Sequence, residues 1–212
     1  MNIGGMVGVN NGSISSGVAI YKSNITGIDE SSSLVGGIAG SSSSSIQSAC
    51  VIGCTITNSG EMTGGMIGYV QSGTIGQEET YLISHTFVAN STITGNGDYS
   101  GGVVGSAEGT LESVCLIDSN VGYQDEKNKA DYVGGIAGYA SLDITKPYVV
   151  AGNGSVSVSG NSDYVGGVVG KVYGTIYRFR VAPSSSGNGA ITIKGLGNYV
   201  GGVAGYAYGL IY

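Results

Sequence analysis

The sequence lacks the features that mark several large classes of protein. It has two prolines, and its glycines follow no Gly-X-Y period, so a collagen-like chain is excluded. No apolar run approaches the ~20 residues that a membrane-spanning helix needs. No Lys/Arg run is present, and only 10 % of the residues are charged, so the footprint of a nucleic-acid-binding protein is absent. No signal peptide is recognisable at the start.

Cysteine and histidine are also scarce. Cys50 and Cys54 stand four residues apart in a segment expected to be extended, where their Cα atoms would lie roughly 13 Å apart, too far for a disulfide. We therefore expect these two and Cys115 to be free, small, buried side chains. A catalytic thiol would need a nearby base, and the single histidine, His85, lies in an insertion without an evident partner.

Glycine is the residue that the chain has in excess. Its 41 glycines far exceed the usual share of about 7 %. The hydrophobic content of 41 % is rich in Val and Ile, which argues against a disordered linker. An ordered chain that combines glycine with β-branched residues indicates short strands joined by tight turns.

A glycine heptad recurs seven times along the chain. The first glycine of each copy stands at position 4, 36, 64, 101, 134, 166 or 201. A motif that returns at such intervals predicts a repeat architecture. The copies are Ile3–Gly8, Leu34–Gly40, Met62–Gly68, Tyr99–Gly105, Tyr132–Gly138, Tyr164–Gly170 and Tyr199–Gly205.

Two further apolar positions keep register with the heptad. One lies ten residues after the first glycine in most copies, as at Ile14 and Ile144, and another precedes the next glycine pair, as at Ile56 and Val158. No helical i, i+3, i+4, i+7 stripe competes with this pattern. The sequence therefore predicts an all-β fold, a β-solenoid (β-helix) of about seven coils, each of roughly 33 residues and three short strands.

The repeats predict one domain, residues 1–212. The chain opens on a motif copy and stops partway through the seventh unit, so we expect it to be a fragment of a longer protein. The predicted repeats are approximately 1–31, 32–60, 61–96, 97–129, 130–161, 162–196 and 197–212, the last one partial.

The repeats resemble the GLUG motif, a bacterial repeat named for its Gly-Leu-hydrophobic-Gly core. That core stands here, for example, as Gly37-Ile38-Ala39-Gly40 and Gly135-Ile136-Ala137-Gly138, with Ile, Val or Met in place of Leu in every copy. The resemblance covers nearly the whole chain. It implies an extracellular, cell-attached location, as in adhesin-like and filamentous-haemagglutinin-like proteins and the non-catalytic region of IgA-specific metalloendopeptidases. It supplies no catalytic residues.

The sharpest candidate for a binding surface is an acidic-aromatic column just before the glycine pairs. Three interpretations stay open: a sugar- or protein-binding strip, calcium held by stacked carboxylates, or turn-capping Asp and Asn beside a tyrosine ladder of purely structural value. The candidate ligand-binding residues are Asp98, Tyr99, Asp131, Tyr132, Asp163, Tyr164, Asn198 and Tyr199.

Other columns and insertions carry weaker expectations. Stacking predicts two inward columns that contain the cysteines, Ala19/Cys50/Phe87/Cys115 and Ser23/Cys54/Ser91/Ser119. A Thr/Ser column, Thr55/Thr92/Ser157 with Thr57/Thr94/Ser159, has the paired hydroxyls of an ice-binding face but breaks at Asn120/Gly122 and Thr192/Lys194. Insertions that could protrude toward a ligand are expected at 76–85, 145–155, 182–189 and, separately, 123–130.

Catalytic motifs are missing from this pattern. There is no His-Glu-x-x-His, no Cys/His metal spacing and no P-loop. The one mixed-charge cluster is Asp163 with Arg178 and Arg180, and we expect the two arginines and Lys171 to be solvated. We predict a non-enzymatic cell-surface module, an adhesin or stalk, without cofactor or metal, whose partners are host proteins or glycans and neighbouring domains, not nucleic acid or membrane. The alternatives are a carbohydrate-active β-helix enzyme (a polysaccharide lyase or hydrolase) and a passive spacer of a larger surface enzyme.

Overall fold

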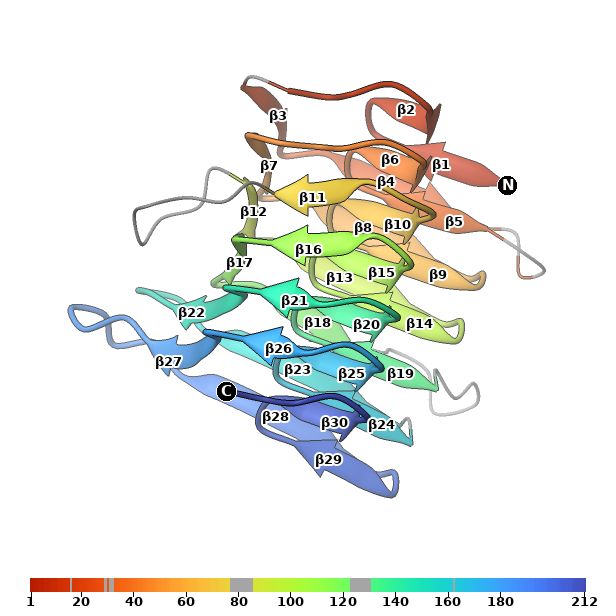
Figure 1. The fold of residues 1–212 in the computed structure, drawn as a ribbon. Coiled ribbons are helices and arrows are strands. Elements are labelled where there is room, and N and C mark those ends of the chain that lie inside the picture. The colour runs from red at the N-terminus through yellow and green to blue at the C-terminus, as the bar shows by residue number, and fades with distance from the viewer. Residues whose placement is uncertain (16, 29, 31–32, 77–85, 123–130, 162) are drawn as a thin grey trace.

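The chain winds into a β-solenoid. The computed structural model describes residues 1–15, 17–28, 30, 33–76, 86–122, 131–161 and 163–212, and all thirty elements in this part of the chain are β-strands. Successive turns lie one below another from the N-terminus to the C-terminus (Figure 1). Every strand pairs in parallel with its counterpart one turn away, so the strands form five sheets that run along the solenoid.

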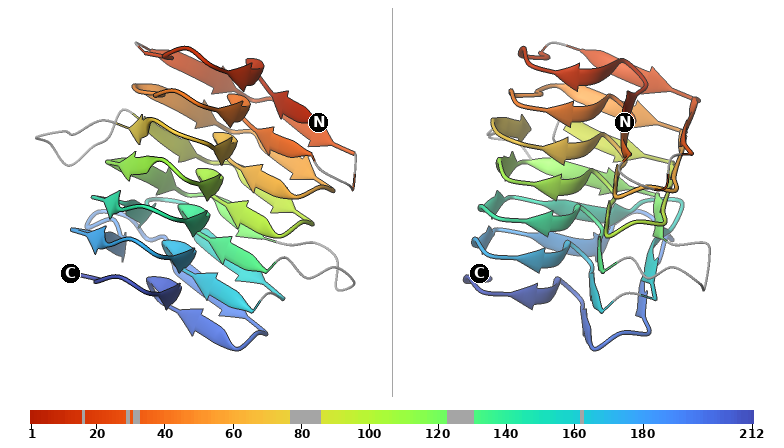
Figure 2. Two further views of the ribbon diagram at one scale, coloured as in Figure 1. Left: turned by 45° about the vertical axis from the view of Figure 1, so that its right-hand side comes forward. Right: turned by 90° about the vertical axis from the view of Figure 1, so that its right-hand side faces the viewer.

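The two halves of the glycine heptad form the first two sheets, which the two views of Figure 2 show as separate stacks. Sheet A consists of β1 (Asn2–Gly4), β5 (Leu34–Gly36), β9 (Met62–Gly64), β14 (Tyr99–Gly101), β19 (Tyr132–Gly134), β24 (Tyr164–Gly166) and β29 (Tyr199–Gly201). Sheet B consists of β2 (Val7–Asn10), β6 (Ala39–Ser42), β10 (Ile67–Val70), β15 (Val104–Ala107), β20 (Ala137–Ala140), β25 (Val169–Val172) and β30 (Ala204–Ala207).

The rest of each turn forms three smaller sheets. Sheet C consists of β11 (Thr74–Gly76), β16 (Thr110–Glu112), β21 (Ile144–Thr145) and β26 (Ile176–Tyr177), and isolated bridges extend it at Ile14, Ile46 and Ile211. Sheet D consists of β3 (Val18–Tyr21), β7 (Ala49–Ile52), β12 (Thr86–Ala89), β17 (Val114–Ile117), β22 (Tyr148–Ala151) and β27 (Arg180–Pro183). Sheet E consists of β4 (Asn24–Gly27), β8 (Thr55–Asn58), β13 (Thr92–Gly95), β18 (Asn120–Gly122), β23 (Val156–Gly160) and β28 (Ile191–Gly195).

This architecture confirms the predicted all-β solenoid. Six turns contribute to all the long sheets, and the last residues add strands β29 and β30 of a partial seventh. The structure divides a turn into up to five strands, whereas the sequence indicated three. Two of the predicted strands are each split by a corner: the heptad bends at its glycine pair, and the third segment bends between sheets D and E.

The core is built from inward columns of like residues. Ile46, Ile75, Leu111 and Ile144 lie one above another in sheet C and are 0 % exposed. Parallel columns in sheets A, D and E hold mostly Val and Ile. Burial of one such side chain contributes about 1.5–3 kcal/mol, and because each turn contacts only its neighbours, these columns hold the stack together.

The heptad glycines permit close approach of backbones. A Cβ atom on Gly135 would lie 2.1 Å from the carbonyl oxygen of Gly167 in the next turn, and one on Gly138 would lie 2.9 Å from the carbonyl oxygen of Tyr132. The glycines with left-handed φ are elsewhere, at Gly17, Gly53, Gly73 and Gly76, within the described residues. The glycine pairs are therefore required for close stacking and do not adopt a left-handed turn conformation.

The corner between sheets D and E uses left-handed residues instead. Lys22, Gly53, Asn90 and Asp118 occupy this corner with φ between 44° and 65°. The residue that follows each of them bonds to the next turn: the Ser91 N–H donates to Oγ of Ser119 at 3.1 Å, and the Cys54 N–H donates to Oγ of Ser91 at 3.1 Å. The predicted inward column Ser23/Cys54/Ser91/Ser119 is confirmed, since its last three members are at most 2 % exposed.

The other cysteine column does not face inward as predicted. Ala19, Cys50, Phe87 and Cys115 do stand in register on sheet D, but Ala19 is exposed, and Cys50 and Phe87 are half-buried. Their neighbours, such as Val51 and Val88, fill the core instead. Side chains alternate along a strand, so a shift of one position decides which residues are inside.

The predicted insertions have mixed outcomes. Residues 145–155 contain strand β22, which pairs with β17, so the middle of that segment belongs to sheet D and the segment as a whole is no insertion. Within 182–189, the segment after Pro183 connects sheets D and E. Positions 77–85, which include His85, and positions 123–130 lie outside the described residues.

Candidate functional site

A ladder of four tyrosines runs along sheet A. Strand register places Tyr99, Tyr132, Tyr164 and Tyr199 at one position of β14, β19, β24 and β29. Consecutive ring centroids are 5.1, 5.0 and 4.9 Å apart with interplanar angles of 9°, 15° and 3°, so the rings are stacked in parallel. The sequence therefore predicted the position of this ladder. Of the three interpretations left open, a tyrosine ladder with a structural role is sufficient to explain the stacking.

A second row of side chains on sheet B lies against this ladder. The residue after the last glycine of each heptad stands in one column, in which Tyr139, Lys171 and Tyr206 are consecutive. The ring of Tyr139 meets Tyr132 edge to face at 6.2 Å, and the ring of Tyr206 meets Tyr199 edge to face at 5.6 Å. The sheets A and B therefore share one aromatic surface.

Two more tyrosines extend the surface beyond sheet B. Tyr173 and Tyr208 follow β25 and β30, and their rings stack at 4.3 Å with an interplanar angle of 7°. Tyr173 also meets Tyr139 edge to face at 5.9 Å. We call the whole surface the tyrosine strip, which comprises Tyr99, Tyr132, Tyr139, Tyr164, Tyr173, Tyr199, Tyr206, Tyr208 and Lys171.

Lys171 lies at the centre of the tyrosine strip. Its Nζ is between 5.2 and 5.9 Å from the ring centroids of Tyr132, Tyr164, Tyr173, Tyr206 and Tyr208. An ammonium group that lies over a ring face, within about 6 Å of the centroid, is attracted by the π electrons. At Tyr132 and Tyr164 parallel rings cover both faces, so Lys171 approaches these two rings from the side. Lys171 is therefore less solvated than expected, because its side chain is half-buried among the rings.

Burial and the charge of Lys171 shift the pKa values of the side chains in the tyrosine strip. Desolvation raises the pKa of Tyr132, the charge of Lys171 lowers it, and Asp131 raises it by a smaller effect. For Lys171, desolvation lowers the pKa, but a hydrogen bond with Tyr173 and the nearby tyrosines outweigh it and raise the pKa overall. The cation is therefore held in its charged form in the middle of neutral phenols.

The acidic half of the predicted column lies at the start of the sheet A strands. The backbone carbonyls of Asp98, Asp131 and Asp163 accept hydrogen bonds from the N–H groups of Tyr132, Tyr164 and Tyr199, at 2.8, 3.1 and 2.8 Å. The amide of Asn198 donates to Oδ1 of Asp163 at 3.3 Å. The backbone of these residues thus continues the ladder, and one side-chain bond links neighbouring turns.

The calcium interpretation gains no geometric support in the described residues. Among them, no group of three or more His, Cys, Asp or Glu side chains converges to hold a metal ion. The mixed-charge cluster also separates, because Asp163 precedes β24 in sheet A, whereas Arg180 belongs to β27 in sheet D. Arg178 lies over the ring of Tyr177 instead, 4.8 Å from its centroid.

The Thr/Ser column forms part of sheet E. Thr55, Thr92, Asn120 and Ser157 are in register as predicted, and so are Thr57, Thr94, Gly122 and Ser159. Only some of these hydroxyls are accessible, since Thr94 is 5 % exposed. Asn120, Gly122 and Lys194 interrupt the columns of hydroxyl side chains in the structure as they do in the sequence. These interruptions argue against an ice-binding face.

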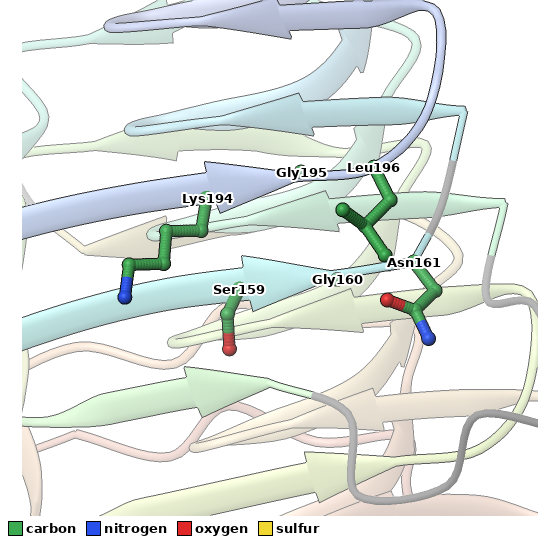
Figure 3. Close-up of a pocket in the computed structure, with 6 residues that line it drawn as sticks. All are labelled: Ser159, Gly160, Asn161, Lys194, Gly195 and Leu196. Atoms are coloured by element: carbon green, nitrogen blue, oxygen red, sulfur yellow. The ribbon is translucent and has the colours of Figure 1, made fainter.

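A shallow hollow lies at one edge of sheet E. Gly160 and Gly195 pair across β23 and β28, and neither has a side chain to fill the space above them. Ser159 and Lys194 stand on one side of the hollow and Asn161 and Leu196 on the other (Figure 3). The hollow carries no cluster of acid, base or nucleophile.

The cysteines show no activated thiol. Cys50, Cys54 and Cys115 are free, as predicted. Burial raises the pKa of Cys115 to about 12, against a smaller lowering by Arg180, and burial also raises the pKa of Cys50. A thiol with a raised pKa is a weak nucleophile at neutral pH.

Five of the nine residues of the tyrosine strip were not predicted from the sequence. The predicted residues all precede the glycine pairs, and the others are Tyr139, Lys171, Tyr173, Tyr206 and Tyr208. A signal was present, because the residue after the last heptad glycine is Tyr69, Tyr139 or Tyr206 in three copies and Lys171 in another. Only the fold of the heptad shows that its two ends share one surface.

The fold and this surface define the class of the molecule: a β-solenoid repeat protein with one aromatic face. In comparisons with known proteins, no family model, curated protein or solved structure matches the chain. The resemblance to GLUG repeats therefore stays an expectation from the motif residues. No helix long and apolar enough to cross a membrane occurs among the described residues.

Proposed function

We propose that this chain is a non-enzymatic repeat module of a bacterial cell-surface protein, which displays its neighbouring domains and binds host proteins or glycans weakly and at several points. The observation that carries the proposal is the tyrosine strip, because it repeats the same half-exposed side chain on successive turns. Tyrosine combines apolar area with a hydroxyl and is enriched in recognition surfaces.

The repetition supports a multivalent mode of binding. A single tyrosine edge offers little area, but ladder positions about 5 Å apart present the same group along the solenoid. Once one contact forms, further contacts are intramolecular and strengthen the whole by effective concentration. A rigid parallel stack keeps these groups in line without ordering cost at the moment of binding.

A glycan array probed with the isolated chain tests this proposal. We expect the double variant Tyr132→Ala/Tyr164→Ala to lose the hits of the wild-type chain, because it removes the two inner rings of the ladder. Tyr21→Ala is the matched control: this tyrosine is 58 % exposed on sheet D, away from the strip. Circular dichroism must show that all three chains keep their strand content.

Two outcomes would contradict binding by the strip. Equal loss in the Tyr21→Ala control would mean that the array reports general stickiness of exposed tyrosine. An array without hits, together with no binding to host-cell proteins in a pull-down, would leave only the stalk role. Release of reducing ends from any polysaccharide on the array would instead favour the carbohydrate-active enzyme.

A further inference from the structure

The ladder geometry limits what the tyrosine strip can recognise. Tyr132 and Tyr164 each have a parallel ring on both faces, at 5.1 and 5.0 Å for Tyr132 and at 5.0 and 4.9 Å for Tyr164. Their faces are therefore unavailable for flat stacking against a sugar ring. The ladder presents ring edges, which are the positive part of the aromatic quadrupole, and phenolic hydroxyls, which can donate hydrogen bonds.

Lys171 adds a full positive charge to these partial ones. Its contacts with the described residues are the five rings and a hydrogen bond with Tyr173, and no carboxylate of the described chain forms an ion pair with it. The rings already restrict the long, flexible side chain of Lys171 in the free protein. Ligand binding therefore costs less side-chain conformational entropy at this residue.

The nearby carboxylates of Asp131 and Glu108 do not cancel the charge of Lys171 at the tyrosine hydroxyls. At Tyr132, Lys171 affects the pKa more than Asp131 does, and at Tyr139, Lys171 affects it more than Glu108 does. Desolvation is the largest effect at both hydroxyls. The centre of the strip is thus locally positive on a chain whose formal net charge is −6.

We infer that the centre of the tyrosine strip, around Lys171, is a subsite for the carboxylate or sulfate group of an acidic polysaccharide. The inference rests on the proposed function and names its ligand class. Lys171 meets the anionic group with a charge-assisted hydrogen bond, and the hydroxyls of Tyr132, Tyr164 and Tyr173 donate to the neighbouring sugar oxygens. A polymer with regularly repeated oxygens matches a ladder with regularly repeated donors, which a peptide of mixed sequence does not.

Three soluble polymers distinguish the sources of the anion. Binding of the chain to polygalacturonate (carboxylate), dextran sulfate (sulfate) and dextran (neutral) is measured by biolayer interferometry at low and at physiological salt. We expect binding to at least one of the two acidic polymers, weakened by salt, and none to dextran. Because charge-assisted bonds are worth more than neutral ones, Lys171→Gln should weaken the acidic interaction about tenfold or more.

Lys194→Gln is the matched control for overall charge. It removes one positive charge from an exposed lysine on β28 in sheet E, next to the hollow of Figure 3. We expect this variant to bind within about twofold of the wild-type chain. Lys171→Arg keeps the charge and should retain more of the affinity for the acidic polymers than Lys171→Gln. If Lys171 had a purely structural role, Lys171→Arg and Lys171→Gln would both lower the melting temperature.

The outcomes separate this inference from the proposed function. Equal weakening by Lys171→Gln and Lys194→Gln would overturn the subsite, because it would show unspecific attraction to a polyanion. Binding to neutral glycans that is lost in Tyr132→Ala/Tyr164→Ala but kept in Lys171→Gln would also overturn it while the proposed function stands. Binding of the acidic polymers that survives the double tyrosine variant would overturn both.

Discussion

Two hydroxyls are buried in an otherwise apolar column of sheet A. Thr63 and Ser100 stand in register between Val35 and Val133, and they are 0 % and 1 % exposed. Neither hydroxyl has a hydrogen-bond partner among the described residues. A buried polar group without a partner retains the full cost of its desolvation. These residues are therefore weak points of the core at the scale of single side chains.

Removal of one hydroxyl should stabilise the fold. Thr63→Val keeps the side-chain shape, so we expect the free energy of unfolding in urea to rise by about 1 kcal/mol. Thr86→Val is the control, because Oγ1 of Thr86 is also buried but accepts a hydrogen bond from the Ser48 N–H at 3.0 Å. That variant should lose about 1–3 kcal/mol. A loss of stability in Thr63→Val would show that its hydroxyl is satisfied in solution.

At this scale the sequence predicted positions better than orientations. It placed Tyr132 and its equivalents in one column and Cys54 in an inward one. It put Cys50 inside, although the left-handed corner at Ser48 and the alternation along β7 turn that side chain outward. Such a corner could not be anticipated, because Ser48, Ser113, Lys146 and Arg178 adopt left-handed φ without being glycine or asparagine.

The glycine heptad is the element on which the stack depends. Its two short strands fold against each other, and the glycine pair between them touches the backbone of the next turn. The last turn differs, since a Cβ on Gly202 would have no atom within 4 Å. The same motif position is thus crowded in Gly135 and open in Gly202, which offers an internal comparison.

Alanine substitutions at these two glycines should differ sharply. In Gly135→Ala the new Cβ would clash with the Gly167 carbonyl oxygen, so we expect a loss of about 1–3 kcal/mol in unfolding free energy, as for overpacked cores. Gly202→Ala should change it by less than about 0.5 kcal/mol. Thermal melts followed by circular dichroism would measure both. Equal effects would mean that the turns are spaced further apart than this structure has them.

The heptad also shows how much of the fold the repeat pattern alone could predict. Recurrence every ~33 residues predicted the solenoid, because only stacking buries the apolar positions of such short strands. The motif did not reveal that its first and last residues face one surface. That depends on the bend at the glycine pair, and so Lys171 and Tyr139 were missed.

For the whole molecule, the aromatic surface is unevenly distributed. The strip begins at Tyr99 and covers the later turns, while the first turns carry Asn2, Leu34 and Met62 at the ladder position. Burial raises the pKa of Tyr99, Tyr132 and Tyr139, and it raises that of Tyr69 to about 12 with help from Glu108. These four tyrosines lie on β10, β14, β19 and β20, so the middle turns depend on tyrosines that stay neutral.

Alkaline pH should weaken the fold first in its middle turns. A tyrosine whose pKa is raised in the folded state binds its proton more tightly there than in the unfolded chain. For Tyr69 this stabilising effect is complete below pH 10.0, the ordinary value, and is lost as the pH rises through about 12. Hydrogen exchange at increasing pH, corrected for the intrinsic rate, should show earlier loss of protection in β10–β20, which carry these tyrosines, than in β1–β8. Uniform loss would contradict this.

The parallel register of all five sheets has a mechanical consequence. The hydrogen bonds between turns point along the solenoid, so a force that pulls the two ends apart acts on one interface between neighbouring turns at a time. A turn that detaches releases ~33 residues, or about 110 Å of extended chain, while the remaining turns keep their contacts. Under load, the molecule would lengthen in steps and behave as a tether that yields without breaking.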